Sequence, residues 1–265
     1  VYVIGGVSFS GSGQVAPQGG FARFCRPRGA GFVRRVAWSG RLSYGTGFFA
    51  PTPITEETET AGLSRLGVIG RLKPERGRSA SFDLTRTTGP LSTTLTLFHS
   101  RVADPVEVER GDRFVLANLA EPTTNTGVDA LSLWKTEDFS LVASYAFVRS
   151  RETTDQGRID VPLTPRHSVG LDAAWEWGGV WRVGAEWYYT GAQRLEANPY
   201  RNESRPYSVF GLLATRQFGR ALLFVNGENL TDVRQTKWDP LVRPTRGIDG
   251  RWTVDAWGPL DGRNI

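Results

Sequence analysis

The strongest constraint on this chain is an alternation of apolar and polar residues with a period of two. Between Trp181 and Thr190 one parity reads Trp, Val, Ala, Trp, Tyr, and the other reads Arg, Gly, Glu, Tyr, Thr. Successive side chains of a β-strand point to opposite faces, so the pattern predicts a strand with one apolar face. Comparable segments, some less regular, recur at 38–48, 79–86, 91–100, 127–135, 139–149, 167–177, 207–218 and 221–229. The chain is therefore predicted to be all-β.

The connections between these segments are alternately short and long. Short turns are expected at 87–90, 136–138, 178–179 and 219–220, and long polar loops at 49–78, 101–126, 150–166, 191–206 and after Leu230. A soluble sandwich also alternates, so the period alone leaves the solvent of the apolar face open. Short turns on one rim and long loops on the other are typical of outer-membrane barrels, in which the loops are extracellular. We expect an antiparallel transmembrane β-barrel fragment with this orientation.

Aromatic residues support the same interpretation. Trp175, Trp177 and Trp181 surround the turn of the hairpin 167–190, whereas Trp187 and Tyr189 lie at its other end. Indole and phenol rings favour the boundary between lipid and water, and barrels carry such rings at both boundaries. A soluble core would not require them at both strand ends. Lipid is therefore the expected partner of the apolar face.

Composition excludes several other classes of protein. There is no apolar run of about 18 residues, and the first residues lack the features of a signal peptide. The net charge is +5, but basic and acidic residues are interleaved, so no nucleic-acid partner is predicted. Cys25 has no nearby histidine, and His99 and His167 have no spaced acidic or cysteine companions. Neither a catalytic thiol nor a metal or cofactor site is predicted.

Carboxylates on the polar parity raise the question of hydrolysis. Four carboxylates on this parity are of the residue type that performs general acid and base catalysis, namely Asp172, Glu176, Glu186 and Glu228. In a large barrel such groups normally line the lumen, and we expect them to be solvated or paired with Arg182 and Arg216. No Ser-His-Asp or paired-carboxylate spacing supports an enzyme.

Three motifs carry a resemblance to a known family. Asn229-Leu230-Thr231-Asp232 resembles the end of the penultimate strand of TonB-dependent receptors. The segment 42–51, LSYGTGFFAP, is similar to the family pattern R-x-x-Y-G-x-G-F-x-A-P, and Leu72-Lys73-Pro74-Glu75 to its L-x-P-E pattern. The resemblance covers about residues 36–265 and implies about nine strands of a barrel that the family builds from 22.

The resemblance also implies a function that this chain alone does not complete. The family imports scarce nutrients such as ferric siderophores, using a plug inside the barrel and a motif that engages the TonB energy-coupling protein. Both are expected outside this chain. The last strand of the family is expected after 260–263 and is not recognised before Ile265. Residues 1–35 are treated as a separate segment, at most a strand remnant, because 12–35 show neither alternation nor family pattern.

The long loops are the expected ligand contacts. Guanidinium groups suit anionic oxygens, and aromatic rings suit flat ligand faces. The residues of this kind predicted to bind ligand are Arg194, Tyr200, Arg201, Trp238 and Arg243. The alternative class of function is a binding module, either a soluble all-β scaffold or an autotransporter-like passenger, which would remain in buffer without detergent.

Overall fold

The computed structural model describes residues 2–15, 21–51, 67, 70, 72–110, 113–154, 157–247 and 250–265, with side chains from residue 28 onward except at 109 and 110. Its strands are β1 (Tyr2–Val15), β2 (Phe21–Arg35), β3 (Trp38–Phe49), β4 (Glu75–Thr88), β5 (Leu91–Ala103), β6 (Val106–Arg110), β7 (Phe114–Asn118), β8 (Thr123–Lys135), β9 (Phe139–Thr154), β10 (Gly157–Asp160), β11 (His167–Trp177), β12 (Trp181–Thr190), β13 (Tyr207–Phe218) and β14 (Ala221–Gly227). A single 3-10 turn, η1 (Gln235–Lys237), is the helical element of the described residues. No helix in these ranges is long and apolar enough to cross a membrane.

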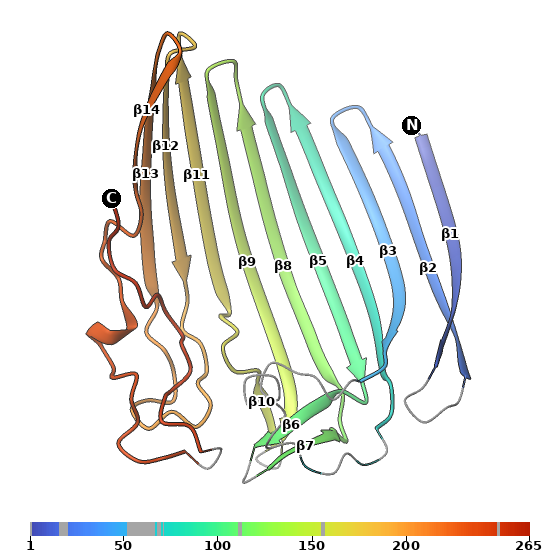
Figure 1. Cartoon of the computed structure of the whole chain (residues 1–265). Coiled ribbons are helices and arrows are strands. Elements are labelled where there is room, and N and C mark those ends of the chain that lie inside the picture. The colour runs from blue at the N-terminus through green and yellow to red at the C-terminus, as the bar shows by residue number, and fades with distance from the viewer. Residues whose placement is uncertain are drawn as a thin grey trace.

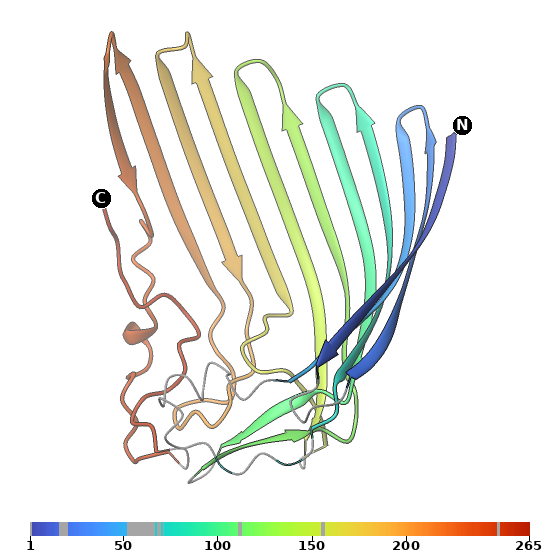
Figure 2. The ribbon, with the colours of Figure 1, turned by 45° about the vertical axis from the view of Figure 1, so that its right-hand side comes forward.

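Eleven of the strands form one antiparallel meander. Their order is β1-β2-β3-β4-β5-β8-β9-β11-β12-β13-β14, and β10 pairs with β9 outside this path. The hairpin β6-β7 forms a separate two-stranded sheet within the connection from β5 to β8. Figures 1 and 2 show the long strands side by side in a curved wall, with β1 at one edge and β14 at the other. The wall is an open part of a barrel, because no described strand joins these edges.

The two ends of the wall differ as the sequence predicts. Tight turns join β4 to β5, β8 to β9, β11 to β12 and β13 to β14 at one end, and the long connections lie at the other (Figure 1). Gly89, Gly178, Gly179 and Gly219 have φ between 56° and 64°. Such a left-handed backbone costs glycine little, which explains the glycines in three of these four turns. We call these the turn end and the loop end.

The two faces of the wall also differ. Along β5, Leu91, Leu95, Leu97, His99 and Arg101 are exposed, and the residues between Leu95 and Arg101 on the opposite parity are half-buried. Side chains on the convex face of a curved sheet spread apart, so we call the face of Leu95 and Leu97 the outward face. Cross-strand register places the apolar parity of most predicted strands on it, for example Ala173 opposite Ala185 and Ala185 opposite Leu212, whereas β8 and β14 also carry exposed apolar residues such as Leu131 and Phe224 on the other face. The predicted alternation is confirmed.

The N-terminal segment differs from the expectation. At most a strand remnant is expected in residues 1–35, but Phe21–Arg35 forms β2, which pairs with β1 from Phe21 to Arg34. β2 also pairs with β3, with Arg35 opposite Trp38. Glycines and prolines interrupt the apolar alternation of this stretch, so that neighbouring strands rather than its own pattern define it as part of the sheet.

Buried apolar side chains lie at the loop end and not on the wall. Among the side chains that the structure describes, the buried apolar ones are Phe114, Leu116, Leu195, Val254 and Trp257. The first two belong to β7, and the others to the connections after β12 and β14. A single curved sheet has no second layer to cover it, so its large apolar residues remain exposed. The connections are therefore the part of the chain that packs like a folded domain.

Candidate ligand-binding rim

The connection after β12 folds back on itself. Arg194 and Glu203 form an antiparallel bridge, and the Ser204 amide donates to the Gln193 carbonyl at 2.8 Å. Its tip is turned by Asn198, whose Oδ1 accepts the amide of Tyr200 at 2.9 Å. Asparagine side chains commonly replace backbone groups in turns of this kind. The result is a short hairpin, 191–206, that carries three of the predicted ligand residues.

The longer connection after β14, residues 230–260, is organised by Gln235. This side chain is fully buried. Its Oε1 accepts the Trp257 amide at 2.8 Å, its Nε2 donates to the Asp255 carbonyl at 3.2 Å, and its own amide donates to the Pro259 carbonyl at 2.8 Å. A buried amide side chain is favourable only when its donors and acceptor are satisfied. One glutamine thus joins the beginning of this connection to its end.

An ion pair joins the two connections. The Arg201 guanidinium lies 2.6 Å from both carboxylate oxygens of Asp239, through NH2 to Oδ1 and through Nε to Oδ2. The Asp239 side chain is 4% exposed and that of Arg201 is 22% exposed. The NH2–Oδ1 contact is a hydrogen bond, whereas Nε and Oδ2 are within ion-pair distance but form no hydrogen bond, so the pair fixes the position of the guanidinium. The 191–206 hairpin is therefore fastened to the 230–260 connection.

Aromatic packing surrounds the ion pair. Trp257 is 3% exposed and stacks on Trp238 with ring centroids 5.6 Å apart and planes at 18°. Arg201 lies 5.8 Å from the centroid of the Trp257 ring, within the range of a cation–π contact. The Tyr200 hydroxyl donates to the Val242 carbonyl, which is a second link between the two connections. We call this combined body the loop-end cap.

The structure places the five predicted ligand residues in two groups. Tyr200, Arg201 and Trp238 lie together inside the loop-end cap, where their polar or aromatic groups already have protein partners. Arg243 lies beside this group, with its amide donating to the Trp252 carbonyl at 2.8 Å. Its Nε is buried and has no hydrogen-bond partner among the described residues.

Arg194 lies in the same hairpin, in the antiparallel bridge with Glu203. Its charge acts on Glu152 at the end of β9, whose pKa is raised first by burial and then by the negative charges of Glu107 and Glu196, while Arg194 opposes the rise. Arg194 is therefore within electrostatic range of the Glu152 carboxylate at the end of β9, whereas Arg201 is paired with Asp239.

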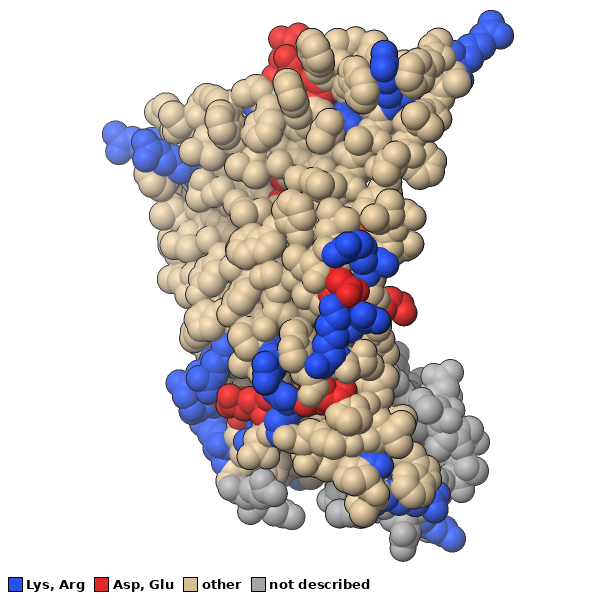
Figure 3. All heavy atoms as spheres, turned by 90° about the vertical axis from the view of Figure 1, so that its left-hand side faces the viewer, with Lys and Arg blue, Asp and Glu red and all other residues tan. Residues whose placement is uncertain are grey.

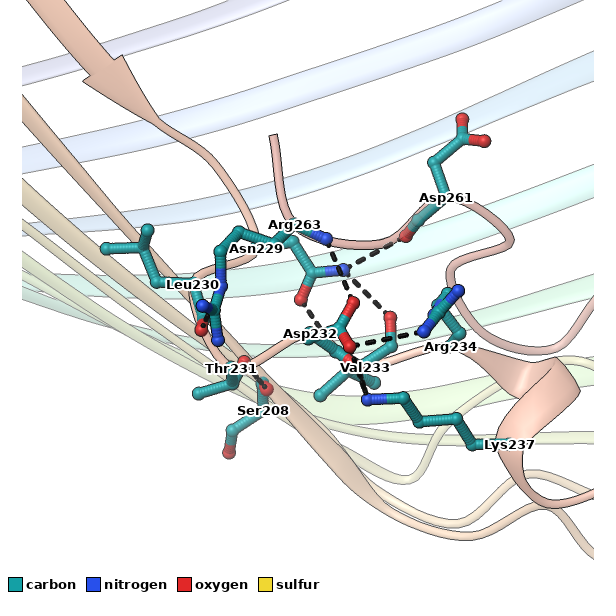
Figure 4. Close-up of polar contacts among 10 residues, drawn as sticks. All are labelled: Ser208, Asn229, Leu230, Thr231, Asp232, Val233, Arg234, Lys237, Asp261 and Arg263. Atoms are coloured by element: carbon teal, nitrogen blue, oxygen red, sulfur yellow. Dashed lines mark hydrogen bonds and ion pairs between the residues drawn. The ribbon is translucent and has the colours of Figure 1, made fainter. Parts of the chain in front are cut away.

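The turn that follows β14 fastens the end of the chain to the wall (Figure 4). The Asn229 amide group donates to the carbonyls of Asp261 and Val233 at 3.0 and 2.8 Å, and its Oδ1 accepts the Val233 amide at 3.0 Å. Glu228 and Asn264 form an antiparallel bridge, with amide-to-carbonyl distances of 2.8 and 3.1 Å. The residues near Asn264 therefore begin to pair alongside the end of β14.

Asp232 completes this turn. Its carboxylate accepts Lys237 Nζ at 2.6 Å, the Arg263 amide at 3.1 Å and Arg234 NH2 at 3.2 Å (Figure 4). The Lys237 hydrogen bond, followed by the Arg263 amide, lowers the pKa of Asp232 to about 2. The motif Asn229-Leu230-Thr231-Asp232 thus has a physical role, because its first and last side chains hold residues 261–263.

Comparison with known proteins agrees with this arrangement. The family model "TonB dependent receptor-like, beta-barrel" matches residues 11–230. The chain belongs to the TonB-dependent receptor family. The match includes β2 and part of β1, so the family pattern extends through residues for which the sequence analysis assigned no strand. No curated protein matches the chain.

Solved TonB-dependent receptors share the fold at low identity. A mutant of the ferric enterobactin receptor PfeA from Pseudomonas aeruginosa has a TM-score of 0.67 at 14% identity, over 91% of this chain and 39% of that one. The FrpB iron transporter from Neisseria meningitidis has 0.66 at 13%, over 86% and 37%. The copper transporter OprC has 0.62 at 16%, over 80% and 34%. This chain thus spans less than two fifths of the length of these receptors.

The inward face of the receptor wall carries the carboxylates that the sequence analysis considered. Asp172 accepts the Tyr188 hydroxyl at 2.6 Å, and Glu176 lies 3.5 Å from Arg182. The expectation that Arg216 also serves these carboxylates is wrong, because Arg216 is on the outward face, 4.6 Å from the centroid of the Trp181 ring. Arg216 is opposite Trp181 in the register, which places it among the outward aromatic residues.

Sequence reasoning missed the residues that shape the receptor rim. Gln235, Asp239 and Trp257 hold the loop-end cap together, yet each stands in a polar connection without periodicity. Trp257 has a signal in retrospect, since a tryptophan in a polar loop commonly marks a small local core. The roles of Gln235 and Asp239 depend on partners 22 and 38 positions away, which no local pattern reveals.

Proposed function

We propose that the complete protein is an outer-membrane TonB-dependent importer of a scarce nutrient, such as a ferric siderophore. In this proposal the present chain supplies a C-terminal part of the barrel wall and two connections of the extracellular rim. The family membership and the asymmetry between a tight turn end and a folded loop end carry the proposal together. Several similar structures are named as receptors for ferric chelates, among them PfeA and the ferric yersiniabactin receptor FyuA from Yersinia pestis.

The apolar outward face supports a membrane location. Leu95, Leu97, Trp175 and Val183 are each at least 40% exposed on it. Figure 3 shows a band with almost no charge between a few charged residues at the turn end and a denser group toward the loop end. An apolar surface of this extent is not stable in water for a monomer, whereas lipid covers it without cost. The soluble binding module is therefore the weaker alternative.

Ligand capture is proposed at the loop-end cap. Arg201, Tyr200 and Trp238 join two connections into one body, and Arg194 and Arg243 add positive charge at its sides. A preformed rim loses less conformational entropy on binding than separate loops do. Its positive groups attract an anionic chelate, and salt weakens that attraction. Transport then needs the plug and the energy-coupling protein TonB, and it involves no nucleic acid and no catalysis.

Uptake by cells tests this function. Cells that express the complete receptor are given radiolabelled ferric chelates, with and without the energy-coupling protein. We expect energy-dependent uptake of at least one chelate. A double variant with Arg194→Ala and Arg243→Ala should lose more uptake at low ligand concentration than at saturation. Uptake that is independent of the coupling protein, or absent for every chelate and metal complex of a broad panel, would refute the proposal.

A further inference from the structure

A row of arginines crosses the outward face near the loop end. Register places Arg78 of β4 directly opposite Arg101 of β5, which is opposite Thr124 of β8, which is opposite Arg151 of β9. Arg158 fills the gap at β8, because its NH2 donates to the Thr124 hydroxyl at 2.8 Å. Arg149 follows two positions nearer the turn end on β9. We call these five arginines the loop-end arginine row.

Four of these five charges lack a counterion among the described residues. Arg151 lies 3.6 Å from Asp160, whereas Arg78, Arg101, Arg149 and Arg158 have no carboxylate within 4 Å in the described part of the chain. Arg78 and Arg101, which are directly opposite each other, are both exposed. Like charges directly opposite each other on neighbouring strands destabilise a sheet. The arrangement is therefore complementary to an anion that comes from outside these residues.

The row lies at one boundary of the apolar band. On β4 the outward residues after Arg78 are Ala80, Phe82, Leu84 and then Arg86. The two arginines are eight positions apart, about 26 Å along the strand, or about 20 Å along the membrane normal at a strand tilt of about 40°. The apolar band of an outer-membrane barrel is about 25 Å tall. Arg86 lies 5.2 Å from the centroid of the Trp38 ring and marks the turn-end boundary, so Arg78 and Arg101 mark the opposite one.

The shape of the row defines the kind of headgroup it fits. From β4 to β9 it crosses three strand spacings, about 14 Å. That width suits a headgroup that carries two phosphates better than one with a single phosphate. Guanidinium forks bind phosphate oxygens in pairs, and Phe82, Leu95 and Leu97 offer an apolar surface directly toward the turn end.

We propose that Arg78 and Arg101, flanked by Arg149, Arg151 and Arg158, bind a doubly phosphorylated glycolipid of the outer leaflet. Its phosphates lie on the arginines and its acyl chains lie along the apolar columns of β4 and β5. The proposal rests on the proposed function for one point only, the assignment of the loop end to the outer leaflet. It gives this part of the wall a specific lipid contact in addition to general lipid exposure.

The test uses the complete receptor purified in detergent, with Arg78→Gln, Arg101→Gln as the variant. Native mass spectrometry measures binding of bisphosphorylated lipid A, the same lipid without phosphates, and inorganic phosphate. We expect the unaltered receptor to bind bisphosphorylated lipid A, and the variant to lose at least about tenfold in affinity, since several charge-assisted hydrogen bonds are removed. Arg86→Gln is the matched control, because it removes an outward arginine at the opposite boundary, and it should bind like the unaltered receptor.

Three outcomes would overturn the site. These are equal binding by the double variant, equal binding of the lipid without phosphates, and binding of inorganic phosphate with no preference for the lipid. Heat-dependent migration on gels confirms that each variant is folded. Because lipid binding is measured in detergent and nutrient uptake in cells, a failed lipid site leaves uptake intact. Likewise, if the complete receptor shows no energy-dependent uptake, its lipid binding in detergent can still be measured.

Discussion

The stability of the variant Ala185→Arg tests whether the outward face lies in lipid. Ala185 is on β12, four residues from Trp181 toward the turn end and four residues from Tyr189 toward the loop end. Each interval spans about 13 Å along the strand, so the rings of Trp181 and Tyr189 are about 26 Å apart along β12, or about 20 Å along the membrane normal at a tilt of about 40°, and Ala185 lies midway between them. Its cross-strand neighbours on this face are Ala173 and Leu212. No polar partner is therefore provided at this level by either adjacent strand.

The expected cost follows from that depth. A lipid-facing arginine at the bilayer midplane destabilises a barrel by about 2 to 4 kcal/mol, and near an interface by about 0 to 1 kcal/mol. Ala185→Arg should thus shift the unfolding equilibrium by about 30-fold to 900-fold. Ser208→Arg is the matched control, because Ser208 is opposite Tyr189 on the same face at the loop-end boundary. It should cost less than about 1 kcal/mol.

The assay is equilibrium unfolding of the complete receptor in phospholipid vesicles by urea, followed by tryptophan fluorescence. Spin labels at Ala173 and Ala185 provide an independent readout, since oxygen dissolved in lipid relaxes labels that are exposed to it. Equal destabilisation by Ala185→Arg and Ser208→Arg would contradict the membrane depth. Water exposure of both labels would refute the assignment of this face to lipid.

Three further predictions concern the edges, the turn and the cap. The isolated chain should not form a heat-modifiable, protease-resistant monomer in detergent, because the open edges at β1 and β14 leave backbone groups unpaired in hydrocarbon. Recovery of such a monomer would count against this prediction. Asp232 should stabilise the turn fully above its unfolded pKa of about 3.9, and this stabilisation should be lost as the pH falls through about 2. The loss should appear as faster hydrogen exchange at the Asn264 amide, after correction for the intrinsic exchange rate. Asp232→Asn should remove this pH dependence. Arg201→Ala should destabilise docking of the hairpin 191–206, because Asp239 is left buried without its partner. Breaking a fully buried ion pair costs about 3 to 5 kcal/mol, and the partial exposure of Arg201 makes the expected cost smaller than that. Limited proteolysis measures this loss, and Arg201→Ala combined with Asp239→Ala should recover part of it; no recovery in the double variant would disprove the coupling.

The wall could be predicted from the sequence because strand alternation is a local property. β11, β12 and β13 begin and end at the residues expected from their alternation. β2 could not be predicted, since glycine and proline interrupt its pattern and its neighbours supply its hydrogen bonds. The hairpin β6-β7 was likewise expected only as part of a polar loop.

The rim was predictable in place but not in detail. Loop length indicates where Arg201 and Trp238 lie, but their contacts depend on Asp239 and Trp257 and on how two connections meet. Arg216 shows the same limit on the wall. Its parity in β13 could be counted, yet its place among outward aromatic residues required the register with Trp181. Local pattern defines strands, whereas partners distant in sequence define the cap.

Labelling of single cysteines on whole cells tests the orientation on which the account depends. In the complete receptor with Cys25 replaced by serine, one variant carries Ala197→Cys in the loop-end hairpin and another carries Arg220→Cys in the turn between β13 and β14. Arg220 is preferred to Gly179, whose φ of 64° disfavours a side chain. An impermeant maleimide should label the cysteine at 197 on intact cells, and the cysteine at 220 only after the outer membrane is permeabilised. Labelling at 220 but not at 197 on intact cells would contradict the extracellular rim and the ligand site proposed there.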